Sequence, residues 1–248
     1  MGKGLGLAGA VHGFAACTGR MVSGIQERMH GVFCTREFTA GVKGEPRPVR
    51  ELVRRATLRN NILLLTQVHG DRIVWAGDAP ELPEADGIIS DNPDDMLGIM
   101  TADCLPVLAW SDNPPLIAAM HAGWRGLAKG IIAKGVRRMQ TLGARDIHLS
   151  LGPAIGPCCF EVGLDVAAEF QGATLRHENG RHFLDLWEIA LGQALEAGVE
   201  RHAVRTLRLC TMCQAALFFS YRREGPTTGR NISLIGGLSC SLPGLQAG

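Results

Sequence analysis

Three residues of types that bind metal ions stand where apolar runs end. His69 follows the apolar run 62–68, Cys104 lies between two further apolar runs, and His121 follows the run 116–120. A β-sheet can bring such strand ends, distant in the sequence, to one rim. Two imidazoles and one thiolate suit zinc, and three protein ligands leave a fourth position for water or substrate, as in catalytic zinc sites. The spacing therefore predicts a metal site, with histidines of an ordinary turn or core as the alternative.

The residues directly after His121 are of kinds that bind anions. Gly123 and Gly126 let the backbone approach a ligand closely, and a helix that begins near Trp124 would present free N–H groups to a phosphate. Arg125 could pair with the same anion, and Trp124 could stack on a nucleobase. A glycine-containing turn around a buried tryptophan is the simpler interpretation, and it stays open.

Four further cysteines form two close pairs. Cys210 and Cys213 have the spacing of a redox pair or of half a zinc site, and Cys158 with Cys159 could supply the other half. Adjacent cysteines chelate one ion awkwardly, so we interpret these four residues as packed small thiols. The eight cysteines of the chain form no compact disulfide framework, and we expect reduced thiols inside the cell.

Short apolar runs bounded by turn residues predict the strands that would position these side chains. They cover Ile62–Val68, Arg72–Ala76, Leu97–Met100, Leu105–Trp110, Leu116–Met120, Ile147–Leu151, Ala215–Ser220 and Asn231–Ile235. Helical spacing of apolar residues predicts helices over Val49–Arg59, Leu127–Leu142, Asp165–Phe170 and Leu184–Ala197. Because strands and helices interleave, we expect an α/β (α+β layered) fold, a single domain with a mixed β-sheet flanked by helices.

Length and charge exclude several classes of protein. The chain has 248 residues, and 25 basic against 24 acidic residues give a formal net charge of +1. It lacks the basic excess of proteins that bind nucleic acids or anionic membranes, and no apolar run has the length of a membrane span.

Arg222, Arg223 and Arg230 follow an aromatic run and could bind phosphate, although surface ion pairs are commoner. The glycine pattern at 4–9 matches a dinucleotide-binding motif by letter only, because no strand precedes it.

Seven segments of the chain carry a specific resemblance. They are TQVHGD (66–71), ADG (85–87), TADCLPVL (101–108), HAGWRGL (121–127), LGPAIGPCCFEVG (151–163), FFSYRR (218–223) and GR (229–230). In this order they resemble the YfiH family, whose members are also described as laccase-domain or polyphenol oxidase-like proteins and are regarded as zinc-dependent purine nucleoside phosphorylases. The resemblance implies one such domain over residues 31–240, preceded by a poorly matched N-terminal segment, 1–30.

The resemblance also implies a set of functional residues. The family's zinc ligands correspond to His69, Cys104 and His121, which would also be the catalytic residues, and substrate contacts are expected at Arg36, Asp86 and Arg125. The implied reactions are phosphorolysis of adenosine, inosine or S-methyl-5'-thioadenosine to the free base and ribose 1-phosphate or methylthioribose 1-phosphate, and deamination of adenosine. The implied protein is a cytoplasmic monomer that acts on small purine nucleosides and phosphate, with no nucleic acid or membrane partner.

One segment departs from the family pattern. Family members usually follow a Thr-Arg pair with x-Gly-Gly-Val-Ser and then Ser-Leu-Asn-Leu, whereas here Thr35-Arg36 is followed by EFTAGVKG (37–44) and the second motif is missing. Arg36 stays a candidate contact for phosphate or ribose. The altered loop around it leaves the substrate range, and catalysis itself, open.

Three other functions remain as alternatives. A copper-dependent polyphenol oxidase would need clustered histidines, whereas the eight histidines here are scattered, although copper could occupy a zinc site. A cysteine hydrolase would use Cys104 as nucleophile and His121 as base. A nucleoside-binding module would need no catalysis at all. For deamination, zinc would activate the attacking water, and Asp86 or Asp103 are candidates for moving the proton or for orienting a ligand.

Overall fold

The computed structural model describes residues 21–26, 29–34, 36, 49–51, 53, 61–170 and 174–237. Residues 49–51 and 53 are helical, and the remainder of the predicted helix Val49–Arg59 lies outside the described residues. The altered loop 37–44 and the glycine pattern at 4–9 also lie outside them.

The strands form three sheets. A six-stranded sheet has the order β13 (Val204–Thr206), β9 (His148–Leu151), β7 (Leu105–Asp112), β8 (Pro115–Ala122), β5 (Gly87–Ser90) and β4 (Ile73–Trp75). A five-stranded sheet has the order β1 (Met21–Gln26), β2 (Met29–Cys34), β14 (Asn231–Gly237), β6 (Met96–Thr101) and β3 (Ile62–Leu63). Each contains parallel and antiparallel pairs. A small antiparallel sheet joins β10 (Glu161–Val162), β12 (Arg181–Leu184) and β11 (Leu175–Glu178).

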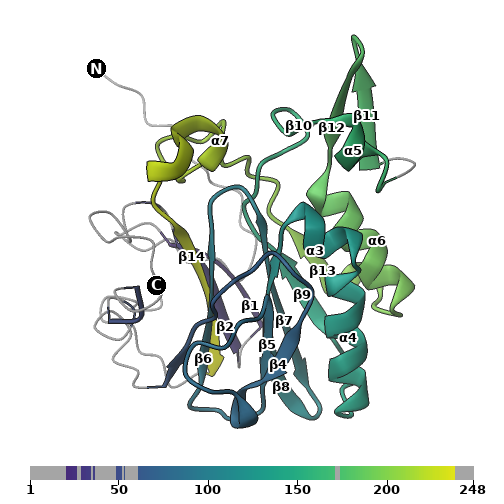
Figure 1. The fold of residues 1–248 in the computed structure, drawn as a ribbon. Coiled ribbons are helices and arrows are strands. Elements are labelled where there is room, and N and C mark those ends of the chain that lie inside the picture. The colour runs from purple at the N-terminus through teal and green to yellow at the C-terminus, as the bar shows by residue number, and fades with distance from the viewer. Residues whose placement is uncertain are drawn as a thin grey trace, which may run out of the picture.

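Helices cover one face of the six-stranded sheet, and the five-stranded sheet covers the other (Figure 1). The helices on that face are α3 (Trp124–Ala128), α4 (Ile131–Thr141) and α6 (Leu186–Glu196). Two shorter helices, α5 (Leu164–Ala167) and α7 (Tyr221–Glu224), lie with the single-turn 3-10 helices Ala76–Asp78, Arg201–Ala203 and Gly225–Thr227 in the connections. The fold therefore has three layers, and the central strands β7 and β8 lie in the middle one.

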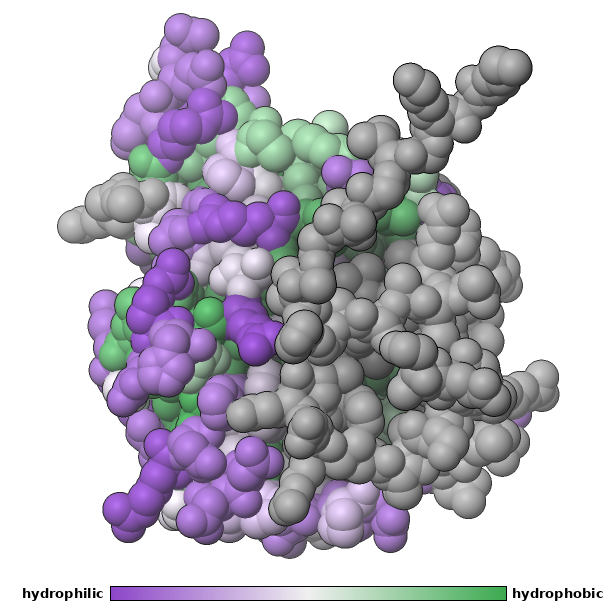
Figure 2. Space-filling view, turned by 180° about the vertical axis from the view of Figure 1, so that it is seen from behind, coloured by the Kyte–Doolittle hydropathy of each residue, from purple (hydrophilic) through white to green (hydrophobic). Residues whose placement is uncertain are grey.

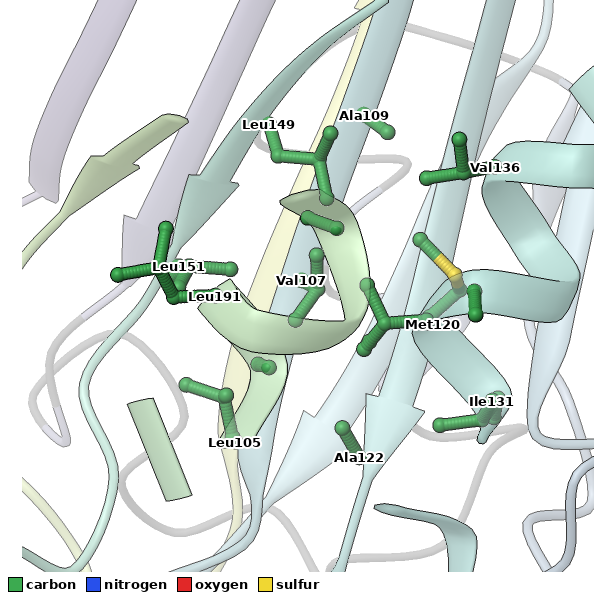
Figure 3. Close-up of a cluster of buried hydrophobic side chains, with 14 of the residues drawn as sticks. Leu105, Val107, Ala109, Met120, Ala122, Ile131, Val136, Leu149, Leu151 and Leu191 are labelled. Atoms are coloured by element: carbon green, nitrogen blue, oxygen red, sulfur yellow. The ribbon is translucent and has the colours of Figure 1, made fainter. Parts of the chain in front are cut away.

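The central strands are buried on both faces because their apolar residues alternate between two clusters. Leu105, Val107 and Ala109 of β7 pack toward the helices, as Figure 3 shows together with residues of α4 and α6. Leu108 and Trp110 of the same strand pack toward the five-stranded sheet. A strand buried in this way is a rigid base for the residues at its ends.

Seen from the opposite side, hydrophilic side chains cover most of the surface of the described residues, with smaller hydrophobic areas between them (Figure 2). None of the helices in the described ranges combines the length and the apolar character that crossing a lipid bilayer requires.

The predicted mixed α/β architecture is confirmed, with the strands divided among three sheets. The prediction of a strand over Ala215–Ser220 is wrong. The amides of Leu217 and Phe218 both donate to the carbonyl of Gln214, so this apolar segment satisfies its backbone in a local turn. The predicted helix over Leu127–Leu142 is in fact two helices, because Gly130 lies between them with a left-handed φ of 77°.

Candidate metal centre

His69, Cys104 and His121, hereafter the His–Cys trio, converge at one end of the sheets. One ligand atom from each residue lies within 4.8 Å of those of the other two. The two imidazole rings stand edge to face, with centroids 4.8 Å apart and an interplanar angle of 79°. Two imidazole nitrogens and a thiolate sulfur at this spacing can hold one metal ion. The predicted convergence of strand ends is present in the structure.

The β7–β8 hairpin fixes two of the three side chains. His121 lies within β8, opposite Pro106 of β7, and Cys104 directly precedes β7. His69 comes from a separate loop that follows an isolated bridge between Thr66 and Glu84. The trio therefore combines a rigid pair from one antiparallel ladder with a third member whose position depends on its loop.

Asp86 connects that loop to the hairpin. Its carboxylate is fully buried, accepts from the backbone amides of His69 at 2.9 Å and Gly70 at 2.6 Å, and lies 2.7 Å from Nδ1 of His121. Burial alone would raise the pKa of Asp86, but the hydrogen bonds from His121 and Gly70 hold it below its ordinary value. An ionised carboxylate only accepts, so Nδ1 of His121 donates and Nε2 is left free to bind a metal.

The backbone is left-handed at His69, with φ of 58°, and at Asp103, with φ of 89°. Residues other than glycine adopt this conformation only where surrounding contacts enforce it. At Asp103 the carboxylate accepts from the hydroxyl of Thr211 at 2.6 Å and the amide of Arg222 at 2.7 Å, while its carbonyl accepts from the amide of Ile155. These bonds hold the residue that directly precedes Cys104.

The charges within the trio are strongly coupled. Burial favours the neutral thiol of Cys104, but the neighbouring imidazoles, His121 first, outweigh burial and lower its pKa to about 6. Burial would likewise lower the pKa of His121, yet the Cys104 thiolate and the Asp86 carboxylate raise it to about 9. Without a metal, Cys104 and His121 thus form a thiolate–imidazolium pair at neutral pH.

Two glycines allow close approach at the trio. A Cβ atom at Gly123 would lie 3.1 Å from Sγ of Cys104, and one at Gly126 would lie 2.7 Å from the backbone carbonyl oxygen of Gly70. Helix α3, which begins at Trp124 as the sequence predicts, can therefore pack against the His69 loop only with glycine at position 126.

The trio lines an open pocket of about 650 Å³ between α3 and α7. Its lining is largely apolar and aromatic, and it includes the arginines 125, 222 and 230. Among the described residues that line the pocket, Asp103 supplies the one carboxylate, which already accepts from Thr211 and Arg222. The pocket therefore combines flat apolar walls, a metal-binding floor and an excess of positive charge, which suits an anionic ligand joined to a planar ring.

Of the three residues expected to bind substrate, the structure places one on the described wall of the pocket. Arg125 lines the pocket, with its guanidinium 4.3 Å from the ring centroid of Trp124. Asp86 is fully buried, contacts Nδ1 of His121 and is not among the described residues that line the pocket. Arg36 is not among the lining residues, because its guanidinium donates to the carboxylate of Glu224 at 3.2 Å and lies 4.5 Å from the ring centroid of Phe219.

Sequence reasoning missed two residues that shape the site. Thr211 lies inside the Cys-x-x-Cys segment, and its hydroxyl is buried against Asp103. Gln67 exchanges hydrogen bonds with both backbone groups of Met100, at 2.7 and 2.8 Å, and so joins the His69 loop to β6. Gln67 belongs to one of the seven segments that carry the family resemblance, whereas Thr211 lies outside them, and nothing in the spacing gives either residue a role.

Comparisons with known proteins show the family to which the chain is similar. A family model described as multi-copper polyphenol oxidoreductase laccase matches residues 18–237. The purine nucleoside phosphorylase YlmD of Geobacillus stearothermophilus is 38% identical over 192 residues, which are 68% of this chain and 70% of that protein. The purine nucleoside phosphorylase YfiH of Shigella flexneri is 32% identical over 234 residues, 90% of this chain and 93% of that one. The crystal structure of YlmD from Geobacillus stearothermophilus superimposes with a TM-score of 0.81 at 28% identity, over 90% of this chain and 98% of the other.

Proposed function

The chain belongs to the YfiH family, whose model is described as multi-copper polyphenol oxidoreductase laccase, and we propose that it is a zinc-dependent purine nucleoside phosphorylase. The observation that carries this proposal is the pocket, in which the His–Cys trio forms the floor beneath aromatic and cationic walls. The relatives named above supply the class of substrate, purine nucleosides with phosphate. Adenosine, inosine and S-methyl-5'-thioadenosine are the proposed substrates.

The trio fits zinc by its chemistry. Two imidazoles and one thiolate are borderline-soft donors that zinc accepts, and three protein ligands leave a fourth position open. Zinc bound there would supply a Lewis acid that lowers the pKa of a ligand water or polarises a substrate oxygen. The residues of the chain prepare this site, since Asp86 fixes the tautomer of His121 and His121 helps to keep Cys104 a thiolate.

For phosphorolysis, the pocket arginines are the proposed phosphate ligands. A phosphate oxygen forms a bond to the anomeric carbon of the nucleoside, and the bond from that carbon to the purine nitrogen breaks. Arg125, Arg222 and Arg230 line the pocket, and their guanidinium groups would hold and orient the phosphate dianion for this attack. Trp124 and Phe160 offer flat apolar surfaces for the purine ring. We propose that Arg36 acts indirectly, through the ion pair with Glu224 next to Arg223.

Deamination of adenosine is proposed as a second activity of the same pocket. It needs a carboxylate or another group that moves a proton near C6 of the purine. Asp103 lines the pocket, whereas Asp86 is fully buried, so Asp103 is the better placed of the two aspartates. Its oxygens already accept from Thr211 and Arg222, and proton transfer would require one of these bonds to open.

The family model's own description suggests a copper oxidase. Multicopper electron transfer uses several histidine-ligated copper ions. Within the described ranges, the two groups of side chains able to hold a metal are the His–Cys trio and a group of four cysteines, and together they contain two histidines. The donor set therefore favours a single zinc ion at the trio, with copper as an ion that could replace it.

A cysteine hydrolase is a second candidate, and one observation favours it. The lowered pKa of Cys104 beside the raised pKa of His121 is the thiolate–imidazolium pair that cysteine hydrolases use for nucleophilic attack. A thiolate bound to zinc loses most of this reactivity. The metal content of the protein as isolated therefore separates the two candidates.

We further propose that one domain covers residues 31–240 and follows an N-terminal segment, 1–30. We also propose that the protein is a cytoplasmic monomer and that it acts on small molecules. The six described cysteines are free thiols, as a reducing compartment would keep them. The elution volume of the purified protein in size-exclusion chromatography tests the monomer.

The test of the proposed function measures adenosine turnover with and without phosphate, together with metal content, in the natural protein and in Cys104→Ala. Adenine should appear only with phosphate, and the variant should lose about 10³-fold or more in kcat/KM, which is at least about 4 kcal/mol of transition-state stabilisation. It should also lose the zinc of the trio. Activity that persists through Cys104 in protein free of metal would reject the phosphorylase and favour the hydrolase.

A further inference from the structure

Four cysteines from two distant segments meet beside the pocket. Cys158, Cys159, Cys210 and Cys213, hereafter the cysteine cluster, have all four Sγ atoms within 4.8 Å of one another. Sγ of Cys213 lies 3.7 Å from that of Cys158 and 3.4 Å from that of Cys159. Our interpretation of these residues as packed small thiols does not explain why four sulfur atoms should point to one place.

The spacing of the sulfur atoms is that of a tetrahedral metal site. Zinc binds thiolates at about 2.3 Å, so the sulfur atoms around one ion are separated by about 3.8 Å. The separations of Sγ of Cys213 from the sulfur atoms of Cys159 and Cys158, 3.4 and 3.7 Å, lie close to this value. A disulfide would instead bring one pair to about 2.05 Å and leave the other two sulfur atoms unexplained.

We propose that Cys158, Cys159, Cys210 and Cys213 bind one structural zinc ion, separate from the ion at the His–Cys trio. Four protein thiolates complete the tetrahedral coordination and leave no position for substrate, so the role of this ion is structural. The site does not depend on the proposed catalytic function, because it shares no residue with the trio.

Hydrogen bonds of the backbone place both segments for such a site. Ala154 and Cys210 form an isolated parallel bridge, in which the amide of Thr211 donates to the carbonyl of Ala154 at 3.0 Å. The amide of Gly156 donates to Sγ of Cys210 at 3.2 Å. Amide donors of this kind stabilise and orient a metal-bound thiolate. The bridge therefore removes the difficulty of adjacent cysteines, since a turn at 157–159 presents both thiols to the Cys-x-x-Cys segment.

The cluster is accessible to a metal ion, because Cys158 and Cys213 are exposed and the other two are half-buried. The cysteine cluster also has direct sequence neighbours that line or support the pocket. Thr211, between two cluster cysteines, donates to Asp103, and Phe160, next to Cys159, lines the pocket. The guanidinium of Arg223 donates to the carbonyls of Thr211 and Met212 at 2.8 Å. Zinc at the cluster would lock together the two loops that support Asp103 and the pocket wall.

The first experiment counts zinc in full-length protein purified from zinc-replete medium under reducing conditions, by elemental mass spectrometry. The natural protein should hold two zinc ions per chain. The double variant Cys158→Ser/Cys213→Ser and the variant Cys104→Ala should each hold one, and the triple variant none. Cys34→Ala, which removes a buried cysteine of β2 that belongs to neither group, is the matched control and should keep both ions.

The second experiment does not depend on the folding of the cluster variants. Cys104→Ala, with an intact cysteine cluster, is reconstituted with Co²⁺ and its absorption spectrum is recorded. A tetrathiolate site should give intense sulfur-to-cobalt charge-transfer bands and the visible bands of tetrahedral cobalt. A spectrum without thiolate bands, or a zinc content that the Cys158→Ser/Cys213→Ser substitutions leave at two, would overturn the proposal. So would an intact mass lower by the two hydrogens of a disulfide in protein isolated without reductant.

Discussion

The His–Cys trio takes its side chains from a buried hairpin and one loop at the floor of a pocket, whereas the cysteine cluster takes its side chains from two turns at the surface. The trio mixes nitrogen and sulfur donors and relies on a buried carboxylate and a left-handed backbone. The cluster has sulfur donors alone, and a backbone bridge aligns its segments. With the two proposed metal ions, one chain would hold an open coordination sphere for chemistry and a closed one for structure.

Asp86→Asn should give the largest difference in zinc affinity between the His–Cys trio and the cysteine cluster. The amide keeps the shape of the carboxyl group but removes the negative charge that orients and supports His121. The affinity of the trio for zinc should fall by about 10 to 100-fold, while zinc at the cysteine cluster should be unaffected. Competition with a chelating dye measures both affinities.

Asp71→Asn is the matched control for this change, because Asp71 belongs to the same loop as His69 but forms a partly exposed ion pair with Lys134. It should change neither affinity, and its effect on the free energy of unfolding should not exceed about 1 kcal/mol. Equal losses of zinc from both sites in Asp86→Asn would mean that Asp86 acts through general stability.

Gly126→Ala should affect the His–Cys trio more than the cysteine cluster, because it displaces the backbone next to His69. Its added Cβ would lie 2.7 Å from the carbonyl oxygen of Gly70, a backbone atom that cannot move aside without displacing the His69 loop. The free energy of unfolding should fall by about 1–3 kcal/mol, and zinc should be lost from the trio first. Urea titration and zinc analysis measure the two effects.

Gly192→Ala is the corresponding control in α6, where an added Cβ meets nothing within 4 Å. An alanine inside a helix should raise the free energy of unfolding by about 0.5–1 kcal/mol. If Gly126→Ala were as stable as the natural protein and kept its zinc, the tight packing of α3 on the loop would have no part in the site.

The smallest expected effect is a difference in the rates at which Cys104 and Cys158 are alkylated in the metal-free protein, and in how the rate at Cys104 depends on pH. The lowered pKa keeps Cys104 a thiolate as the pH falls to about 6, whereas burial and the Cys210 thiol raise the pKa of Cys158 to about 11. After chelation of zinc, iodoacetamide should therefore modify Cys104 in preference to Cys158 at neutral pH, and the rate at Cys104 should fall below pH 6. Peptide mass spectrometry after timed alkylation measures this. A faster reaction at Cys158 at pH 7 would contradict it.

The trio could be predicted from the sequence because each residue directly follows or precedes an apolar run, and local periodicity reports such runs. For the cysteine cluster the sequence suggests two halves of a zinc site, but packed thiols are the preferred interpretation, since the convergence depends on a bridge between Ala154 and Cys210, two residues that no local pattern pairs. The sequence offers Asp86 as a candidate for orienting a ligand, but it does not show that the partner is His121. An aspartate after an alanine in a turn does not show that its carboxylate will be buried against a histidine 35 residues later.

The errors in the fold have the same origin. Gly130 interrupts an amphipathic pattern that continues on both sides of it, so periodicity alone joins α3 to α4. The apolar residues at 215–219 resemble a strand, but a strand also needs a partner, and the backbone there bonds to Gln214 instead. Local patterns predict where the elements lie, and long-range pairing decides which of them form.

The β7–β8 hairpin offers a practical use. It holds Cys104 and His121 at one end, and its tip, residues 112–115, lies at the other end with Asp112 and Asn113 exposed. A reporter peptide or a fluorescent domain inserted at this tip would leave the register between Pro106 and His121 intact, because the ladder between tip and ligands spans the whole length of both strands. The hairpin therefore gives protein engineers an attachment point that the core separates from the His–Cys trio.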